Sequence, residues 1–164
     1  MHQTAWEALS SFQPIVKLFN KTNDKSARWV IPFHPGDPAQ LILSRQTWES
    51  GGIEQITLVI RFKATGQTIY YGAIDEKGVF YPSRQLRAED TPQKRKVWEL
   101  LKALRNDPQK ILAEAGKRSG YCCICNRELS DPQSIRAGIG PVCAAKYGWS
   151  TEPQLDLNFR KEPQ

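Results

Sequence analysis

The stretch ITLVIRFKATGQTIYYGAIDEKGVFY (residues 56–81) has the clearest secondary-structure signal in the chain. Its first eight residues alternate between apolar side chains at even positions and mainly polar side chains at odd positions, which is typical of a half-buried strand. Turn residues at 64–67 and 75–78 separate two further strands, at 68–74 and 79–81. The pattern predicts a three-stranded antiparallel meander.

Aromatic residues recur on these strands, namely Tyr70, Tyr71, Phe80 and Tyr81. They could stack nucleic-acid bases on an open sheet face. They could also pack against one another across the strands, which is the commoner role of such residues.

Upstream of the meander we expect helical and extended segments. The apolar spacing in residues 4–21 predicts one or two short amphipathic helices, interrupted at Pro14. Residues 29–33 are expected to form a strand, and Pro32 favours an edge position for it. A second short strand is expected at residues 41–44.

Downstream, the apolar period changes from 2 to 3.6, which predicts two helices. Thr91 suits the cap of the first helix, whose apolar stripe consists of Val97, Leu100, Leu101 and Leu104. Asp107 and Pro108 suit the start of the second helix, and Gly116 suits its end.

The charge of the chain is concentrated in this helical pair. The whole chain has a net charge of +6, and residues 91–118 contain 8 basic and 3 acidic side chains, a net +5. Such a patch is most often a solvated surface, but it can also bind phosphate groups. The basic residues that we predict to contact nucleic acid are Lys94, Arg95, Lys96, Lys102, Lys110, Lys117, Arg118, Arg127 and Arg136.

Length and composition narrow the protein class. The chain has 164 residues, 40% of them hydrophobic and 24% charged, which is typical of a globular protein able to bury a core without metals or disulfides. It contains no apolar run long enough to cross a membrane, and the N-terminus lacks the pattern of a signal peptide. We therefore expect a cytoplasmic protein with no membrane partner and no small-molecule substrate.

All four cysteines lie in the segment GYCCICNRELSDPQSIRAGIGPVCAAKYG (residues 120–148). Cys122 and Cys125 form a C-x-x-C knuckle, and Cys143 follows Pro141 at the expected start of a helix. A knuckle followed by a ligand in the first turn of a helix is how treble-clef zinc sites are built. The spacing predicts Zn²⁺ as the cofactor, bound by reduced thiolates and not replaced by disulfides.

The fourth ligand of this site stays open. The complete pattern would place Cys or His at position 146, where this chain has Lys146. Cys123 and His34 are equally ranked alternatives, and His2, Asp131 or solvent are also possible ligands.

An enzymatic role is not expected. Zinc with an open position can activate water, but three thiolates reduce its Lewis acidity. The chain also contains no H-x-E or HEXXH motif to supply a general base, and no thioredoxin-like context surrounds the C-x-x-C pair.

The same segment resembles an uncharacterised family of phage and bacterial proteins, a domain of unknown function. Its hallmark is a C-x-x-C knuckle, then an R-x-L-[ST]-D-P-x-S stretch and G-[IY]-G-P-x-C, which here occupy residues 120–148. Asn126 stands where the family usually has Gly. The resemblance implies a zinc-binding module of a phage or mobile-element protein and implies no activity.

Together these features predict an α+β fold, with an antiparallel β-meander, flanking helices and a C-terminal treble-clef-like zinc knuckle. The expected segments are 1–28 (helical), 29–90 (antiparallel β), 91–118 (basic helical pair), 119–149 (zinc-binding module) and 150–164 (tail). We expect a non-catalytic zinc protein that contacts nucleic acid through its basic helices. The alternative is a zinc-stabilised interaction module that binds or diverts a host protein complex.

Overall fold

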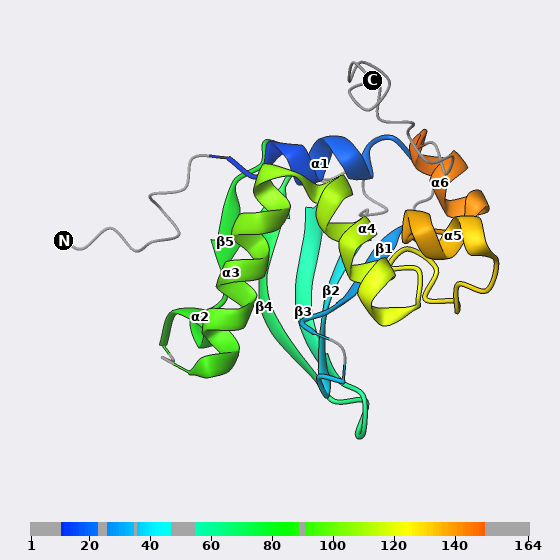
Figure 1. Ribbon diagram of the computed structural model, residues 1–164. Coiled ribbons are helices and arrows are strands. Elements are labelled where there is room, and N and C mark those ends of the chain that lie inside the picture. Colours follow the sequence, from blue (N-terminus) through cyan, green and yellow to red (C-terminus); the bar gives the residue numbers. More distant parts are fainter. Residues whose placement is uncertain (1–10, 23–25, 35, 47–54, 89–90, 150–164) are drawn as a thin grey trace, which may run out of the picture.

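The computed structural model describes residues 11–22, 26–34, 36–46, 55–88 and 91–149. It contains one five-stranded antiparallel sheet in the order β1-β2-β3-β4-β5, so that every strand pairs with its neighbour in sequence (Figure 1). The strands are β1 (Arg28–Pro32), β2 (Ala39–Gln46), β3 (Gln55–Phe62), β4 (Thr68–Asp75) and β5 (Phe80–Pro82). The predicted α+β class with an antiparallel meander is confirmed, and the meander also includes the two upstream strands.

The register of β3 and β4 follows the alternation in the sequence. Ile56 lies opposite Ile74 and Ile60 lies opposite Ile69, so the even positions of β3 face the core. A bulge between Leu58 and Val59 shifts the register at Gly72, whose φ is 143°. A Cβ at position 72 would lie 2.5 Å from the Tyr81 carbonyl oxygen, so glycine allows β5 to pair at this point.

Six helices complete the described part of the chain: α1 (Gln13–Phe19), α2 (Arg84–Ala88), α3 (Pro92–Asn106), α4 (Pro108–Ser119), α5 (Pro132–Ala137) and α6 (Pro141–Tyr147). The predicted caps are confirmed, because the Thr91 and Asp107 side chains accept hydrogen bonds from the N–H groups of Lys94 and Lys110. Helix α2 was not predicted. None of these helices has the length and apolar content needed to cross a bilayer.

Two predicted helix boundaries are wrong. Pro14 does not interrupt a helix; it lies in the first turn of α1, where a missing N–H costs no hydrogen bond. Gly116 does not end α4, which continues to Ser119 and is capped by Gly120 in the left-handed conformation. Residues 1–10 of the predicted N-terminal helices lie outside the described residues.

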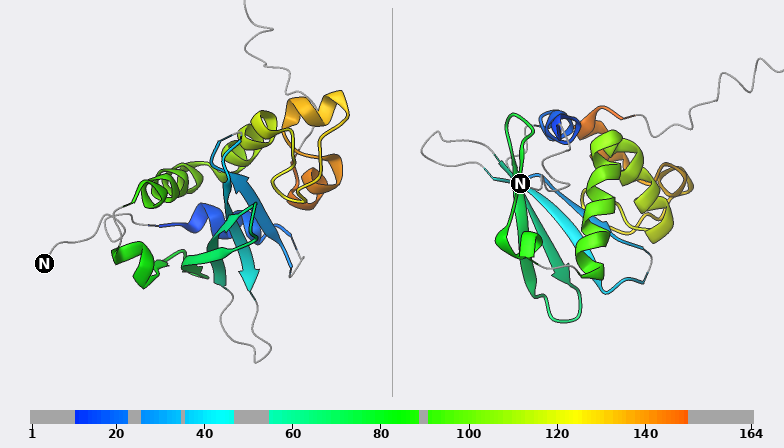
Figure 2. Two further views of the ribbon diagram at one scale, coloured as in Figure 1. Left: turned by 90° about the horizontal axis from the view of Figure 1, so that it is seen from below. Right: turned by 90° about the vertical axis from the view of Figure 1, so that its left-hand side faces the viewer.

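The core lies on one face of the sheet, and the helices cover that face (Figures 1 and 2). In the right-hand view of Figure 2, the sheet and helices α3 and α4 form two separate layers. The core cluster contains the inward side chains of the strands, such as Trp29, Leu41 and Leu58, together with residues from helices α1, α3 and α4. We call the opposite face of the sheet its outer face.

The C-terminal module (residues 119–149) is attached to the edge strand β1. The N–H of Val30 donates to the carbonyl of Cys123 at 2.7 Å, so the module occupies part of the free edge of β1. On the core side, the indole N–H of Trp29 donates to the hydroxyl of Tyr147 at 3.1 Å. The Trp29 ring also stacks on Phe19 at a centroid distance of 4.0 Å, which joins α1, β1 and α6.

Helix α4 packs against the C-terminal module through two glycines. A Cβ on Gly116 would lie 1.9 Å from the carbonyl oxygen of Gly138, and a Cβ on Gly138 would lie 1.9 Å from that of Ala113. The backbones therefore approach more closely than any other residue type permits. This contact explains a glycine inside a helix, where it is otherwise unfavourable.

We predict that Gly116→Ala lowers the free energy of unfolding by about 2 kcal/mol or more, because the added methyl group forces α4 away from the module. Alanine alone would raise helix stability, so a loss reports the close approach. Chemical denaturation measures the effect, with Glu114→Ala on the exposed side of the same helix as a control. Equal stability of the two variants would contradict the proposed packing.

Candidate metal centre

The C-x-x-C knuckle is a tight turn closed by backbone hydrogen bonds. The N–H of Cys122 donates to the carbonyl of Arg127 at 2.9 Å, and the N–H of Asn126 donates to the carbonyl of Cys122 at 2.8 Å. Asn126 has a φ of 60°, the left-handed conformation that Gly adopts freely and that Asn tolerates better than most residues. Asn126 is therefore compatible with the turn.

The third cysteine comes from helix α6. Gly140 and Pro141 begin this helix, and Cys143 is its third residue. Helix α5 lies between the knuckle and α6 and is capped at its start by Asp131 and at its end by Gly138. The sulfur atoms of Cys122, Cys125 and Cys143 all lie within 4.8 Å of one another, so these three residues could hold a metal ion.

The electrostatics of the cluster favour a thiolate. The hydrogen bond from the Cys143 thiol, together with backbone N–H groups of Gly140, Cys125 and Ile124, lowers the pKa of Cys122 to about 5, although burial opposes this shift. The same hydrogen bond raises the pKa of Cys143, so the pair keeps one proton at neutral pH. A metal ion that binds both sulfurs would displace this proton.

Cys123 has a different environment. Its side chain is 2% exposed and belongs to the hydrophobic core cluster, and burial raises its pKa to about 12. It lies outside the group of three sulfurs that approach within 4.8 Å. Its predicted role as the fourth ligand is untested, and this burial favours a packing role, in which its carbonyl holds the edge of β1.

The other candidates for a fourth ligand already have partners or lie elsewhere. The Nε2 atom of His34 lies 2.9 Å from the Asp37 carboxylate. The Asp131 carboxylate accepts a hydrogen bond from the N–H of Ser134 at 3.0 Å and so caps α5. Lys146 is exposed on α6, and His2 lies outside the described residues.

The predicted basic residues fall into two groups. Lys96 lies 3.0 Å from the Asp37 carboxylate, Lys102 lies 2.8 Å from Glu99, and Lys94 is half-buried. The exposed group consists of Arg95, Lys110, Lys117, Arg118, Arg127 and Arg136. Within the described residues, none of these six forms an ion pair.

Sequence reasoning missed the role of Asp37, whose side chain is 1% exposed. Its carboxylate accepts a hydrogen bond from the N–H of Ala39 at 2.9 Å and binds both Lys96 and His34. Burial raises the pKa of Asp37, but the Ala39 N–H and the Lys96 ammonium outweigh burial and hold it below its usual value. Asp37 thereby fastens the β1–β2 loop to α3, and its loop position alone could not reveal this contact.

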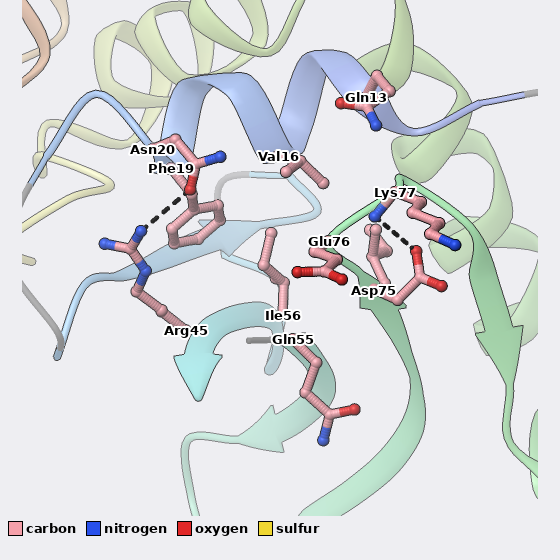
Figure 3. Close-up of a pocket in the computed structure, with 11 residues that line it drawn as sticks. Gln13, Val16, Phe19, Asn20, Arg45, Gln55, Ile56, Asp75, Glu76 and Lys77 are labelled. Atoms are coloured by element: carbon pink, nitrogen blue, oxygen red, sulfur yellow. Dashed lines mark hydrogen bonds between the residues drawn. The ribbon is translucent and has the colours of Figure 1, made fainter. Parts of the chain in front are cut away.

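A cavity of about 430 Å³ lies away from the cysteines, between α1 and the ends of β3 and β4 (Figure 3). Its lining combines the cations Arg45 and Lys77 with the anions Asp75 and Glu76. The Arg45 guanidinium donates to Asn20 at 3.0 Å, and the Asp75 carboxylate accepts from the N–H of Lys77 at 2.9 Å (Figure 3). The lining thus carries two cations and two anions, so its formal charge favours neither an anionic nor a cationic ligand.

We predict that Asp37→Asn destabilises the protein by about 1–3 kcal/mol at pH 7, because charge-assisted hydrogen bonds to the loop and to Lys96 are lost. The pKa of Asp37 is lowered by folding, so its stabilisation is complete above the unfolded value near 3.8 and is lost as the pH falls through the folded value. Denaturation curves at pH 7 and pH 3 would show a smaller difference between variant and wild type at pH 3. A difference that does not shrink would contradict this role.

We also predict that each of the single variants Cys122→Ser, Cys125→Ser and Cys143→Ser releases one equivalent of bound metal. Each variant should also destabilise the C-terminal module. Cys123→Ala is the matched control, and we expect it to keep the metal, because its sulfur lies outside the group of three. Metal content per protein, measured by mass spectrometry of the purified variants, decides the question. Full metal content in all three serine variants would exclude the site.

Comparison with known proteins gives a match over the segment that contains the cysteines. A model of a family of unknown function (DUF6011) matches residues 113–148, which contain the end of α4, the knuckle, α5 and α6. No curated protein and no solved structure matches the chain. The part of the chain that is similar to this family is therefore the part that brings the three cysteines together.

Proposed function

We propose that the protein is a non-catalytic zinc-binding protein that contacts nucleic acid. The observation that carries the zinc proposal is the group of three cysteine sulfurs within 4.8 Å. Thiolate ligands from a knuckle and a helix start suit Zn²⁺, which prefers sulfur and nitrogen ligands in a tetrahedral arrangement. Backbone N–H groups that point at the Cys122 sulfur provide the outer hydrogen bonds typical of such sites.

The proposed role of the metal is structural. Cys122 and Cys125 precede α5, and Cys143 follows it, so one ion would cross-link both ends of the module. Three thiolates would also leave the ion little Lewis acidity for water activation. A histidine could serve as a general base beside the metal, but His34, the histidine among the described residues, lies against Asp37 and so supports a loop.

The nucleic-acid proposal is supported by the exposed cations. Lys110 and Lys117 lie seven residues apart on α4, which places them on the same side of the helix. Arg118 extends this side to the end of α4, and Arg127 follows on the knuckle. Cations without acidic partners are free to bind phosphate, which supplies sequence-independent affinity.

The resemblance to phage and bacterial proteins supports a role of this protein in a phage or mobile element.

We predict that affinity for an oligonucleotide falls steeply as salt is raised. The double variant Lys110→Gln/Lys117→Gln removes two phosphate contacts, so the slope of log K against log salt becomes shallower by about 1.4–1.8. The double variant Lys17→Gln/Lys21→Gln removes the same charge from exposed positions near α1 and serves as the control. Gel-shift titrations at several salt concentrations measure both slopes. Absence of binding at low salt, or equal slopes for the two double variants, would refute this contact surface.

A second candidate is a protein-interaction module. Large apolar side chains are exposed on consecutive helices of the C-terminal module, with Ile135 on α5 at 47% and Val142 on α6 at 70%. Exposed apolar residues of this kind are typical of protein contacts when they are contiguous. A partner captured through Ile135 and Val142, together with absence of nucleic-acid binding, would favour this candidate.

A further inference from the structure

We propose that single-stranded nucleic acid binds in a cleft between the outer face of the sheet and the cysteine knuckle. This inference rests on the proposed function and gives it a substrate class and a site away from the basic side of α4. The cleft has a volume of about 390 Å³, within the range of ligand pockets. Its lining includes Gln40, Arg61 and Lys63 on the sheet side and Ser119, Tyr121 and Asn126 on the opposite side.

The charge of the cleft suits a phosphate group. Arg61 and Lys63 are its charged residues, and neither forms an ion pair within the described part of the chain. The Arg61 guanidinium donates one hydrogen bond to the Gln40 side chain at 3.0 Å, which orients it along the sheet. No carboxylate of the described residues forms an ion pair with its remaining N–H groups, so the cleft offers a preoriented cation to an anionic backbone.

Aromatic side chains accompany these cations. Tyr121 forms part of the cleft wall and is 49% exposed. On the outer face of the sheet, Val59 lies opposite Tyr70, and Arg61 lies two residues further along β3 on the same face. Tyr70 is also 49% exposed, so an apolar and aromatic row continues from the cleft across the sheet.

This combination favours a single strand. A groove with cations for the backbone and aromatic rings for successive bases is how proteins bind single-stranded nucleic acid without sequence preference. Bases of a duplex are already stacked on each other and cannot lie on Tyr121 or Tyr70. Helices α3 and α4 lie on the core side of the sheet in both views of Figure 2. On the other face, the half-buried Val59 and the exposed Tyr70 offer a strand a path from the cleft over β3 and β4.

The cleft also connects binding to the metal centre. Its sheet wall comes from β1, β2 and β3, and its opposite wall comes from Ser119, Tyr121 and Asn126. Tyr121 and Asn126 flank the C-x-x-C pair, and the module is fastened to β1 by the Cys123 carbonyl. Loss of the metal ligands should therefore remove one wall of the cleft.

Fluorescence anisotropy with a labelled oligothymidine of about twelve nucleotides tests the proposal, with a duplex of equal length as competitor. Tyr121→Ala should weaken binding by about 5- to 150-fold, whereas Tyr121→Phe should bind like the wild type because it keeps the ring. Lys63→Gln should weaken binding and make its salt dependence shallower, while Lys17→Gln leaves both unchanged. Cys125→Ser should weaken binding to the same extent as removal of the metal by a chelator.

The outcomes separate this inference from the proposed function. If the wild type binds nucleic acid but Tyr121→Ala and Lys63→Gln bind equally well, the cleft is excluded while nucleic-acid binding stands. A duplex that competes better than an unlabelled single strand would also overturn the inference. If the wild type binds neither form at low salt, both proposals fail. Thermal unfolding and metal content of each variant identify losses that come from misfolding.

Discussion

The attachment of the C-terminal module to strand β1 is the contact on which the rest of the structure depends. A hydrogen bond from the Val30 N–H to the Cys123 carbonyl closes part of the sheet edge, and the hydrogen bond from Trp29 to Tyr147 joins the module to the core. Trp29 and Val30, which are neighbours in β1, thus bind the module from the core side and from the strand edge. The sheet, the cysteine cluster and the cleft are therefore parts of one arrangement.

The two adjacent cysteines of the knuckle have opposite environments, and this follows from the turn itself. Cys122 accepts hydrogen bonds from the Cys143 thiol and from backbone N–H groups, which hold its pKa near 5. Cys123 points into the core, where burial raises its pKa to about 12. In this turn Cys122 supplies a thiolate, while Cys123 supplies packing and a backbone carbonyl.

Local signals in the sequence predicted the strands of the meander, the caps at Thr91 and Asp107 and the three clustered cysteines, because each depends on neighbouring residues. Features that depend on distant contacts could not be predicted. Gly116 has the sequence pattern of a helix end. The structure shows that glycine is needed there because the backbone of Gly138, from a later segment of the chain, packs against it. The buried role of Asp37 and the cleft around Arg61 likewise require α3 and the knuckle to be in place.

The covered edge of β1 has a consequence for self-association. An unpaired edge strand with a run such as Trp29-Val30-Ile31 offers N–H and C=O groups and apolar surface to another chain, which is a common route to aggregation. The knuckle shields this edge by pairing with Val30. If metal holds the module in place, it would also protect the sheet edge, and metal depletion would then lower the solubility of the whole protein as well as the order of one module.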